Sequence, residues 1–443
     1  VSTAGTYLTA AGIYVTGSAV STIGKNTVSN AAGSSTPNMW GALYGIFHGP
    51  AKGGYLRVLE NEVSLVQDST VNQTAVYGIR SEIGGAVTSG GNPQDENKLV
   101  ITGNMLSVRG GYAGGGQFQL ISHTGAIQNL NISDNVFGNI HFNGLSNCYF
   151  INNAMNSSPQ ASVIIIRDNR LDGVFRVNGL GSSMGFPGQI IFINNSGNIS
   201  GNILKDTIEG NDFSNFDVSD GNPLKSQVVI GVQDAIGGTA APFAPKYISG
   251  NRFTNIAGVQ LRAFNISKTG VNATDTGRIS HNIISNVHGI NYGIQINNAD
   301  GVIANIHDNR IDSSHNTGMN LTQTRGIDIY GGAYFNIYNN RIAHLAASHA
   351  SSAPLVYGIQ IRNGVEVNVY NNMIGFLGAP ASPNLPDFNL AGIYAERGDT
   401  IRLFHNTLYL APADPAKDDY AISGILYTET SDEVDMRNNI VYV

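Results

Sequence analysis

Apolar and polar residues alternate with a period of two in many short segments of the chain. Segments 335–337, 359–361 and 365–369 place apolar side chains at every second position, as strands with one buried face do. No segment sustains the 3.6-residue apolar spacing that an amphipathic helix needs. The pattern predicts an all-β chain.

Two short phrases recur along the sequence. In the first, an apolar residue stands three positions before an Asn. These Asn residues are Asn26, Asn61, Asn104, Asn135, Asn169, Asn211, Asn251, Asn282, Asn309, Asn340, Asn372, Asn406 and Asn439. The second phrase is Gly-Ile within a strand-like segment, at Gly12, Gly45, Gly78, Gly293, Gly326, Gly358, Gly392 and Gly424. Two independent phrases that share one period indicate a repeat protein.

A repeat built from strands predicts a solenoid in which each strand pairs in parallel with its equivalent in the next coil. We predict a right-handed parallel β-helix of about 13 coils of roughly 31–34 residues each. Residues 1–443 form a single domain in this prediction, with loop insertions near 84–96, 179–188, 217–246 and 378–389. Equivalent residues then lie ~4.8 Å apart, so the repeated Asn side chains form an internal ladder.

The amino-acid composition excludes several classes of protein. Charged residues make up 12% of the chain and the formal net charge is −7, with no basic cluster, which argues against nucleic-acid binding. The 42% apolar content excludes intrinsic disorder. No apolar run approaches the ~20 residues of a membrane span. The lone Cys148 allows no internal disulfide.

Segments 335–340, 367–372, 403–409 and 436–441 resemble right-handed parallel β-helix repeat proteins. The chain is most similar to the large secreted surface proteins of Bacteroidota that are type IX secretion substrates. This resemblance implies an extracellular or cell-surface location. Three Asp-Ser/Thr triplets look like the O-glycosylation motif of that phylum, with acceptors Ser69, Thr207 and Thr400. Because the chain starts at Val1 without Met and stops in a strand-like run, we expect a segment of a longer chain.

Many parallel β-helix proteins degrade polysaccharides, so an enzyme has to be considered. The polygalacturonase motifs and the lyase motifs are not present in this sequence. Stacking places Gln295, Asp328, Gln360 and Tyr394 in one exposed column and Asn297, Tyr330, Arg362 and Glu396 in the next. Asp328, Arg362 and Glu396 then lie within about 10 Å of one another. They would form either a sugar-binding or hydrolytic groove, or a solvated face with charge pairs between coils.

A second set of outward residues stands two positions before the ladder Asn: His307, Tyr338, Tyr370 and Phe404. Stacked aromatic rings stabilise a sheet, and they could also serve as a flat platform for a glycan or as a lateral contact between fibres. The ten His residues show no metal-ligand spacing, so no metal and no cofactor is expected.

The sequence favours an extracellular structural or adhesive segment of a large cell-surface or filament protein, with glycan contacts. The alternative is a polysaccharide lyase or tailspike-like glycoside hydrolase. Expected partners are surface polysaccharide and further copies of the chain, joined end to end or laterally, because uncapped β-helix ends expose strand edges.

Overall fold

The structure is a computed structural model of the whole chain. It describes residues 10–17, 20–30, 42–50, 54–67, 75–84, 97–110, 117–143, 147–156, 162–178, 189–198, 203–218, 227–237, 246–267, 277–297, 303–313, 323–332, 334–347, 355–378, 390–410, 422–428 and 432–443. All regular elements in these ranges are β-strands, β1 to β40. Within the same ranges, no helix has the length and apolar character needed to cross a bilayer.

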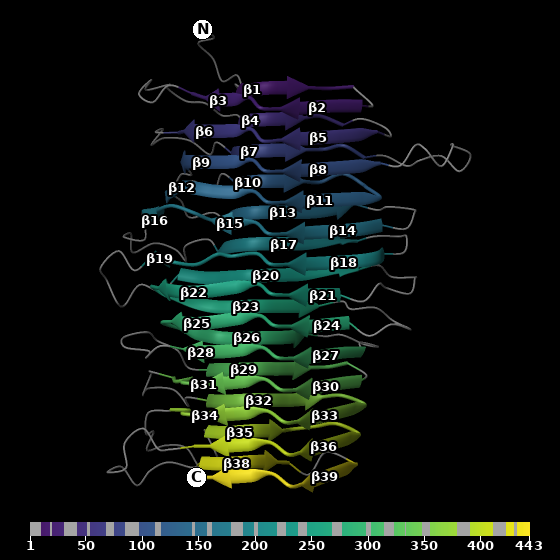
Figure 1. The fold of residues 1–443 in the computed structure, drawn as a ribbon, viewed down its shortest axis with the longest axis vertical. Helices are drawn as coiled ribbons and strands as arrows, with labels where there is room; N and C mark the ends of the chain where they lie inside the picture. Colours follow the sequence, from purple (N-terminus) through teal and green to yellow (C-terminus); the bar gives the residue numbers. More distant parts are fainter. Residues whose placement is uncertain are drawn as a thin grey trace, which may run out of the picture. The chain divides into compact units, whose positions relative to one another are not determined.

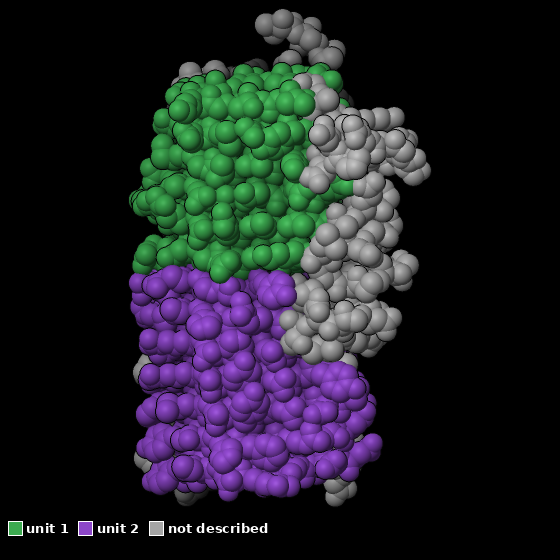
Figure 2. Space-filling view, turned by 45° about the vertical axis from the view of Figure 1, so that its right-hand side comes forward, with its two compact units in different colours: residues 1–220, 233–241 green, residues 221–232, 242–443 purple. Residues whose placement is uncertain are grey.

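The chain divides into two compact units, residues 1–220 with 233–241 and residues 221–232 with 242–443, which Figure 2 colours green and purple. Most of the predicted loop insertions lie outside the described residues. The segment 217–246 was expected to be one such insertion, but it contains the strand β20 (Gln227–Gly237). Its apolar residues Val229 and Val232 are buried, and this burial explains why the segment forms a strand.

Unit 1 consists of parallel strands that stack coil upon coil on three faces, here called sheets A, B and C (Figure 1). Sheet A pairs β1 (Ala10–Val15), β4 (Ala42–His48), β7 (Ala75–Ser81), β10 (Phe118–His123), β13 (Cys148–Asn156) and β17 (Ile190–Asn198). Sheet B pairs β2 (Val20–Gly24), β5 (Tyr55–Leu59), β8 (Lys98–Thr102), β11 (Asn129–Ser133), β14 (Ser162–Arg167) and β18 (Ile203–Glu209). Sheet C holds β3 (Thr27–Ser29), β6 (Glu62–Val66), β9 (Met105–Gly110), β12 (Val136–Asn143) and β15 (Arg170–Leu171), and β16 (Phe175–Asn178) also pairs with β12. The two-residue strand β19 (Phe216–Asp217) follows β18 along the chain.

Unit 2 repeats the same three faces. Its sheet A pairs β23 (Val259–Ser267), β26 (Ile290–Asn297), β29 (Gln323–Tyr330), β32 (Leu355–Asn363), β35 (Leu390–Ala395) and β38 (Ile422–Tyr427). Sheet B pairs β21 (Lys246–Ser249), β24 (Gly277–Ser280), β27 (Ile303–His307), β30 (Tyr334–Tyr338), β33 (Glu366–Tyr370), β36 (Thr400–Phe404) and β39 (Glu433–Arg437). Sheet C pairs β22 (Arg252–Ala257), β25 (Ile283–Val287), β28 (Arg310–Ser313), β31 (Arg341–Ala343), β34 (Met373–Gly375), β37 (Thr407–Tyr409) and β40 (Ile440–Tyr442). The predicted parallel β-helix is confirmed.

The predicted Asn ladder is present in both units, at the corner between sheets B and C. In unit 1 each side-chain amide donates to the next Asn at 2.9 Å, from Asn26 through to Asn211. In unit 2 the same bonds measure 3.0 Å, from Asn251 through to Asn439. The bonded Asn residues are between 27 and 43 positions apart, so coil length varies more than the predicted 31–34 residues while the corner stays in register.

The Gly-Ile phrase marks a close approach between sheets A and C. A Cβ at Gly326 would lie 2.5 Å from the carbonyl oxygen of Gly358 and 2.7 Å from the Ile342 side chain. The Ile that follows the Gly is aligned with its equivalents, as Ile327 is with Ile359, and it is buried in all copies except the first and the last, Ile13 and Ile425, which are partly exposed. The phrase therefore repeats because the interior has no room for a side chain at the Gly position.

Candidate functional site

Four side chains predicted to stack on the outer face of sheet B lie in register on β27, β30, β33 and β36 of unit 2. The rings of His307 and Tyr338 are stacked with 4.7 Å between centroids and 6° between planes, and those of Tyr338 and Tyr370 with 4.9 Å and 3°. Phe404 follows Tyr370 in register, and the guanidinium of Arg437 lies 5.8 Å from its ring centroid. We call His307, Tyr338, Tyr370 and Phe404 the aromatic column.

Neighbouring rings in the aromatic column cover one another's faces. Tyr338 has His307 stacked on one face and Tyr370 on the other, so only its edge and hydroxyl remain for solvent. The expected flat platform for a sugar ring is therefore wrong, because such a platform needs a free ring face. Burial raises the pKa of Tyr370, as does the neighbouring Tyr338, so its hydroxyl stays protonated and able to donate. The column presents the hydroxyl groups of Tyr338 and Tyr370 instead.

A row of amides runs beside the aromatic column on the same face. Asn336 donates to Asn305 at 2.9 Å and Asn368 donates to Asn336 at 3.1 Å, each one coil apart. Arg402 continues the register and pairs with Glu366. We call Asn305, Asn336 and Asn368 the amide row. Three amides and two hydroxyls on consecutive coils suit hydrogen bonding to an extended polymer that carries hydroxyl groups.

The predicted carboxylate candidates lie on sheet A of unit 2. Asp328 Oδ2 accepts from Arg362 at 2.8 Å and from Gln295 at 2.9 Å. Gln360 donates to Glu396 at 3.3 Å and accepts from Arg325. The column Gln295, Asp328, Gln360 and Tyr394 is aligned as expected.

Two expectations about this cluster are wrong. The register shifts between Ile329 and Tyr330, so Tyr330 aligns with Asn363 and not with Arg362. The Arg362 side chain instead reaches back to Asp328, with its guanidinium 5.3 Å from the Tyr330 ring centroid. In the first column, Asp328 and Gln360 are buried and not exposed as expected, and Gln295 and Tyr394 are only partly exposed.

Burial changes the pKa of the Asp328 carboxyl. Loss of water raises the pKa of this carboxyl, and the neighbouring Arg362 and Arg325 oppose that rise. Its second oxygen, Oδ1, has no hydrogen-bond partner among the described residues. A general acid needs contact with its substrate, and a carboxyl without exposed area does not offer it. The geometry is that of a buried ion pair.

The three proposed glycan acceptors differ in accessibility. Thr207 on β18 is buried and its hydroxyl has no hydrogen-bond partner among the described residues. Thr400, the first residue of β36, is partly exposed on the face that carries the aromatic column. Ser69 lies outside the described residues.

Unit 1 contains an interior polar column that the sequence analysis missed. Strands β4, β7, β10, β13 and β17 align His48, Ser81, His123, Asn153 and Asn195, all buried. Burial lowers the pKa of His123 to about 4, and lowers that of His48. The sequence signal for this column was position, because each residue stands two after a core residue of the repeat, where β23, β26, β29 and β32 of unit 2 have Ile.

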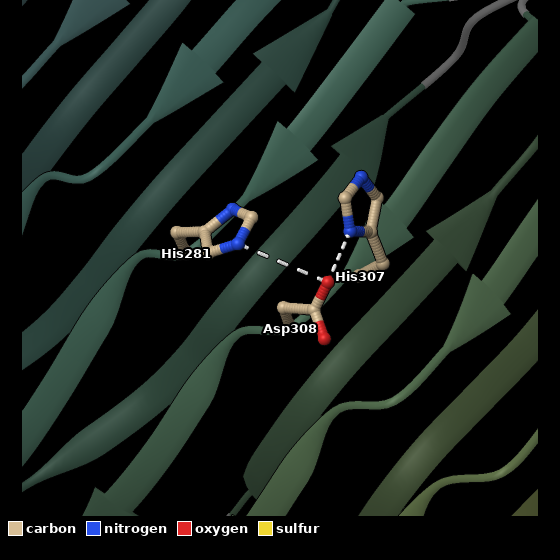
Figure 3. A group of neighbouring side chains, drawn as sticks. All are labelled: His281, His307 and Asp308. Carbon is tan, nitrogen blue, oxygen red and sulfur yellow. Dashed lines mark hydrogen bonds and ion pairs between the residues drawn. The ribbon is translucent and has the colours of Figure 1, made fainter.

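The described residues contain one group of side chains with the geometry of metal ligands: His281, His307 and Asp308 (Figure 3). Sequence spacing did not predict this group, because His281 and His307 are on successive coils. No protein-family model, no curated protein and no solved structure matches the chain.

Proposed function

We propose that this chain is an extracellular structural or adhesive β-helix segment of a large cell-surface or filament protein. In this proposal, sheet B of unit 2 contacts surface polysaccharide through the hydroxyls of the aromatic column and the amide row. The observation that carries it is the repetition of Tyr338 over Tyr370 and Asn336 over Asn368 at the spacing of one coil. Hydrogen-bond donors and acceptors that are evenly spaced along the sheet suit a polymer with regularly repeated units better than a single small molecule.

The proposed location and lineage rest on the repeat phrases. Segments 335–340 and 436–441 resemble secreted Bacteroidota β-helix proteins, and a parallel β-helix is the architecture that such a resemblance implies. The low share of charged residues, 12%, suits a rigid spacer whose cohesion comes from backbone ladders and buried amides.

The binding experiment removes hydroxyls and leaves the rings. The double variant Tyr338→Phe, Tyr370→Phe keeps the stacked rings, so the fold is preserved. It removes both Tyr hydroxyl groups from the proposed binding face. Affinity for the best ligand in a panel of neutral and acidic polysaccharides is expected to fall about tenfold, which corresponds to ~1.4 kcal/mol. Tyr409→Phe is the matched control, because Tyr409 belongs to another stacked Tyr pair, with Tyr442 on sheet C at 5.1 Å. Equal affinities for the double variant and the parent would contradict the proposal.

The alternative function, a polysaccharide lyase or glycosidase, is favoured by one observation, the raised pKa of the Asp328 carboxyl beside Arg362. The same polysaccharide panel tests it through its products. Release of unsaturated or reducing oligosaccharides that is lost in Asp328→Asn or Glu396→Gln would replace the structural proposal by the enzymatic one. We expect no release, because the Asp328 side chain is buried.

Self-association is part of the proposed role. In β40, Ile440 and Tyr442 have 66% and 61% of their surface exposed, and the neighbouring Val441 has 45%. Exposed apolar strands pair readily with other strand edges. We expect the 443-residue polypeptide to form oligomers as its concentration rises in sedimentation velocity. Ile440→Lys with Tyr442→Lys should reduce them, and a parent chain that stays monomeric would contradict this step.

A further inference from the structure

Three potential metal ligands lie at one corner of unit 2. His281 and Asp308 stand directly before the ladder residues Asn282 and Asn309, and both adopt left-handed backbone angles, with φ of 58° and 55°. The ladder bond of 3.0 Å between Asn282 and Asn309 fixes this corner in both coils. His307, the last residue of β27, precedes Asp308, and its carbonyl oxygen accepts from the backbone nitrogen of His281 at 3.3 Å. The backbone therefore holds all three residues in place.

The side chains converge on the Asp308 carboxylate (Figure 3). Asp308 Oδ2 lies 2.6 Å from Nδ1 of His307 and 3.9 Å from Nε2 of His281. The two imidazole rings meet edge to face, with 5.7 Å between centroids. Stacking on Tyr338 fixes the ring of His307, which belongs to the aromatic column. The three ligand atoms all lie within 4.8 Å of one another.

This donor set has a definite metal preference. Two imidazole nitrogens and one carboxylate oxygen suit Zn²⁺, Ni²⁺ or Cu²⁺, whereas Mg²⁺ and Ca²⁺ prefer sites made of oxygen alone. Ligand atoms bound at ~2.0 Å in a tetrahedron stand roughly 3.3 Å apart. His281 must approach the carboxylate by less than 1 Å on this estimate, and its side chain is 65% exposed and free to do so.

We propose that His281, His307 and Asp308 form a surface site for a borderline divalent cation, with Zn²⁺ as its probe. The ion would replace the proton shared between His307 and Asp308 and bind Nε2 of His281, Nδ1 of His307 and a carboxylate oxygen of Asp308. Three protein ligands leave at least one coordination position open for water or for a donor from a partner. The inference does not depend on polysaccharide binding.

The same unit provides a matched control. His344 lies 2.9 Å from Oδ1 of Asp312 and its ring stacks on Phe376 at 5.0 Å, so it repeats the pairing of His307 with Asp308 and Tyr338. This second pair has no additional His in a ligating position among the described residues. A His-Asp pair that stacks on an aromatic ring is thus present with and without the third ligand.

The experiment is a titration of the untagged 443-residue chain with ZnCl₂ in calorimetry. The parent should bind one equivalent, and MgCl₂ and CaCl₂ should give no heat of binding at the same concentration. His281→Asn should weaken Zn²⁺ binding at least tenfold, since Asn tolerates the left-handed backbone and removes the imidazole. Asp308→Asn should weaken it similarly, and His344→Asn should leave affinity and stoichiometry unchanged.

A spectroscopic measurement identifies the ligands. Cu²⁺ bound to the parent should show electron paramagnetic resonance splitting from two imidazole nitrogens, and His281→Asn should reduce it to one. Absence of Zn²⁺ binding by the parent, equal affinity of parent and His281→Asn, or loss of binding in His344→Asn would each overturn the proposal. If Asp308→Asn fails to fold, the Zn²⁺ affinity of His281→Asn still tests the proposal.

Discussion

The side-chain amide of Asn340 donates to Oδ1 of Asn372 at 3.0 Å and also to the carbonyl oxygen of Ile306 at 2.8 Å. Its own Oδ1 accepts from the backbone and side-chain nitrogens of Asn309, at 3.1 and 3.0 Å. One side chain thus takes part in four hydrogen bonds with the two neighbouring coils, and its amide donates a fifth to the Tyr338 carbonyl oxygen at 3.1 Å, while only 1% of its surface is exposed. Water cannot replace these bonds, so each ladder Asn ties its coil to both neighbours.

Asn340→Ala is expected to lower the free energy of unfolding by about 3–5 kcal/mol, because it leaves buried donors and acceptors unpaired. The control is Asn336→Ala, which removes the 2.9 Å bond to Asn305 and the 3.1 Å bond from Asn368 at a partly exposed position, where water can replace them, and should cost less than about 1 kcal/mol. Urea midpoints, together with hydrogen exchange of β30 and β33, measure both. Similar decreases in the free energy of unfolding for the two variants would mean that the ladder Asn stabilises the fold no more than an Asn on the outer face.

Gly326→Ala tests the close approach between sheets A and C. The new methyl group would meet the backbone carbonyl oxygen of Gly358 on the next strand of sheet A at 2.5 Å and the Ile342 side chain of sheet C at 2.7 Å. We expect a loss of about 1–3 kcal/mol from overpacking. The comparison variant is Gly24→Ala, whose nearest neighbour would be 3.3 Å away. Thermal unfolding of the two variants should show the larger decrease for Gly326→Ala.

The buried His123 predicts that stability depends on pH. Its pKa in the folded chain is about 4, below the ordinary 6.5, so the unfolded chain takes up a proton that the folded chain refuses. Between pH 6.5 and 4 this group alone should remove about 3 kcal/mol as the pH falls, with no effect above pH 7.

His123→Asn should flatten this pH dependence, whatever its effect on stability at neutral pH. Urea denaturation of parent and variant at several pH values between 4 and 7 gives the difference in slope, in which the contribution of the carboxyl groups cancels. His344→Asn serves as the exposed control. A parent and a His123→Asn variant with the same slope would show that His123 is protonated in the folded chain.

The proposed O-glycosylation of Thr207 and Thr400 leads to a prediction about accessibility. A glycan is bulky and polar, so it can be attached to a folded chain only at an exposed hydroxyl. Thr400 is partly exposed and Thr207 is buried. In protein produced by a Bacteroidota host, mass spectrometry should find a glycan at Thr400 and none at Thr207. Occupancy at Thr207 in folded protein would contradict the packing of β18.

The sequence alone determined the repeat, the parallel strands and the ladder from Asn26 to Asn439. It could do so because stacking is a local rule: equivalent positions in successive coils meet, and two residues in each coil, the corner Asn and the crowded Gly, allow almost no substitution. The same rule predicts the alignment of Tyr338 with Tyr370 and of Asp328 with Gln360, which the structure shows.

Only the tertiary structure decided what those aligned side chains face. Tyr338 and Tyr370 stack face to face, so they expose their hydroxyls and not the flat ring faces that were expected. The register shifts at Tyr330, and the Arg362 side chain pairs with Asp328. The convergence of His281 on Asp308 depends on two left-handed turns one coil apart. Periodicity fixes which residues share a column, but ring orientation, bulges and burial arise from packing among side chains distant in sequence, and no repeat phrase encodes them.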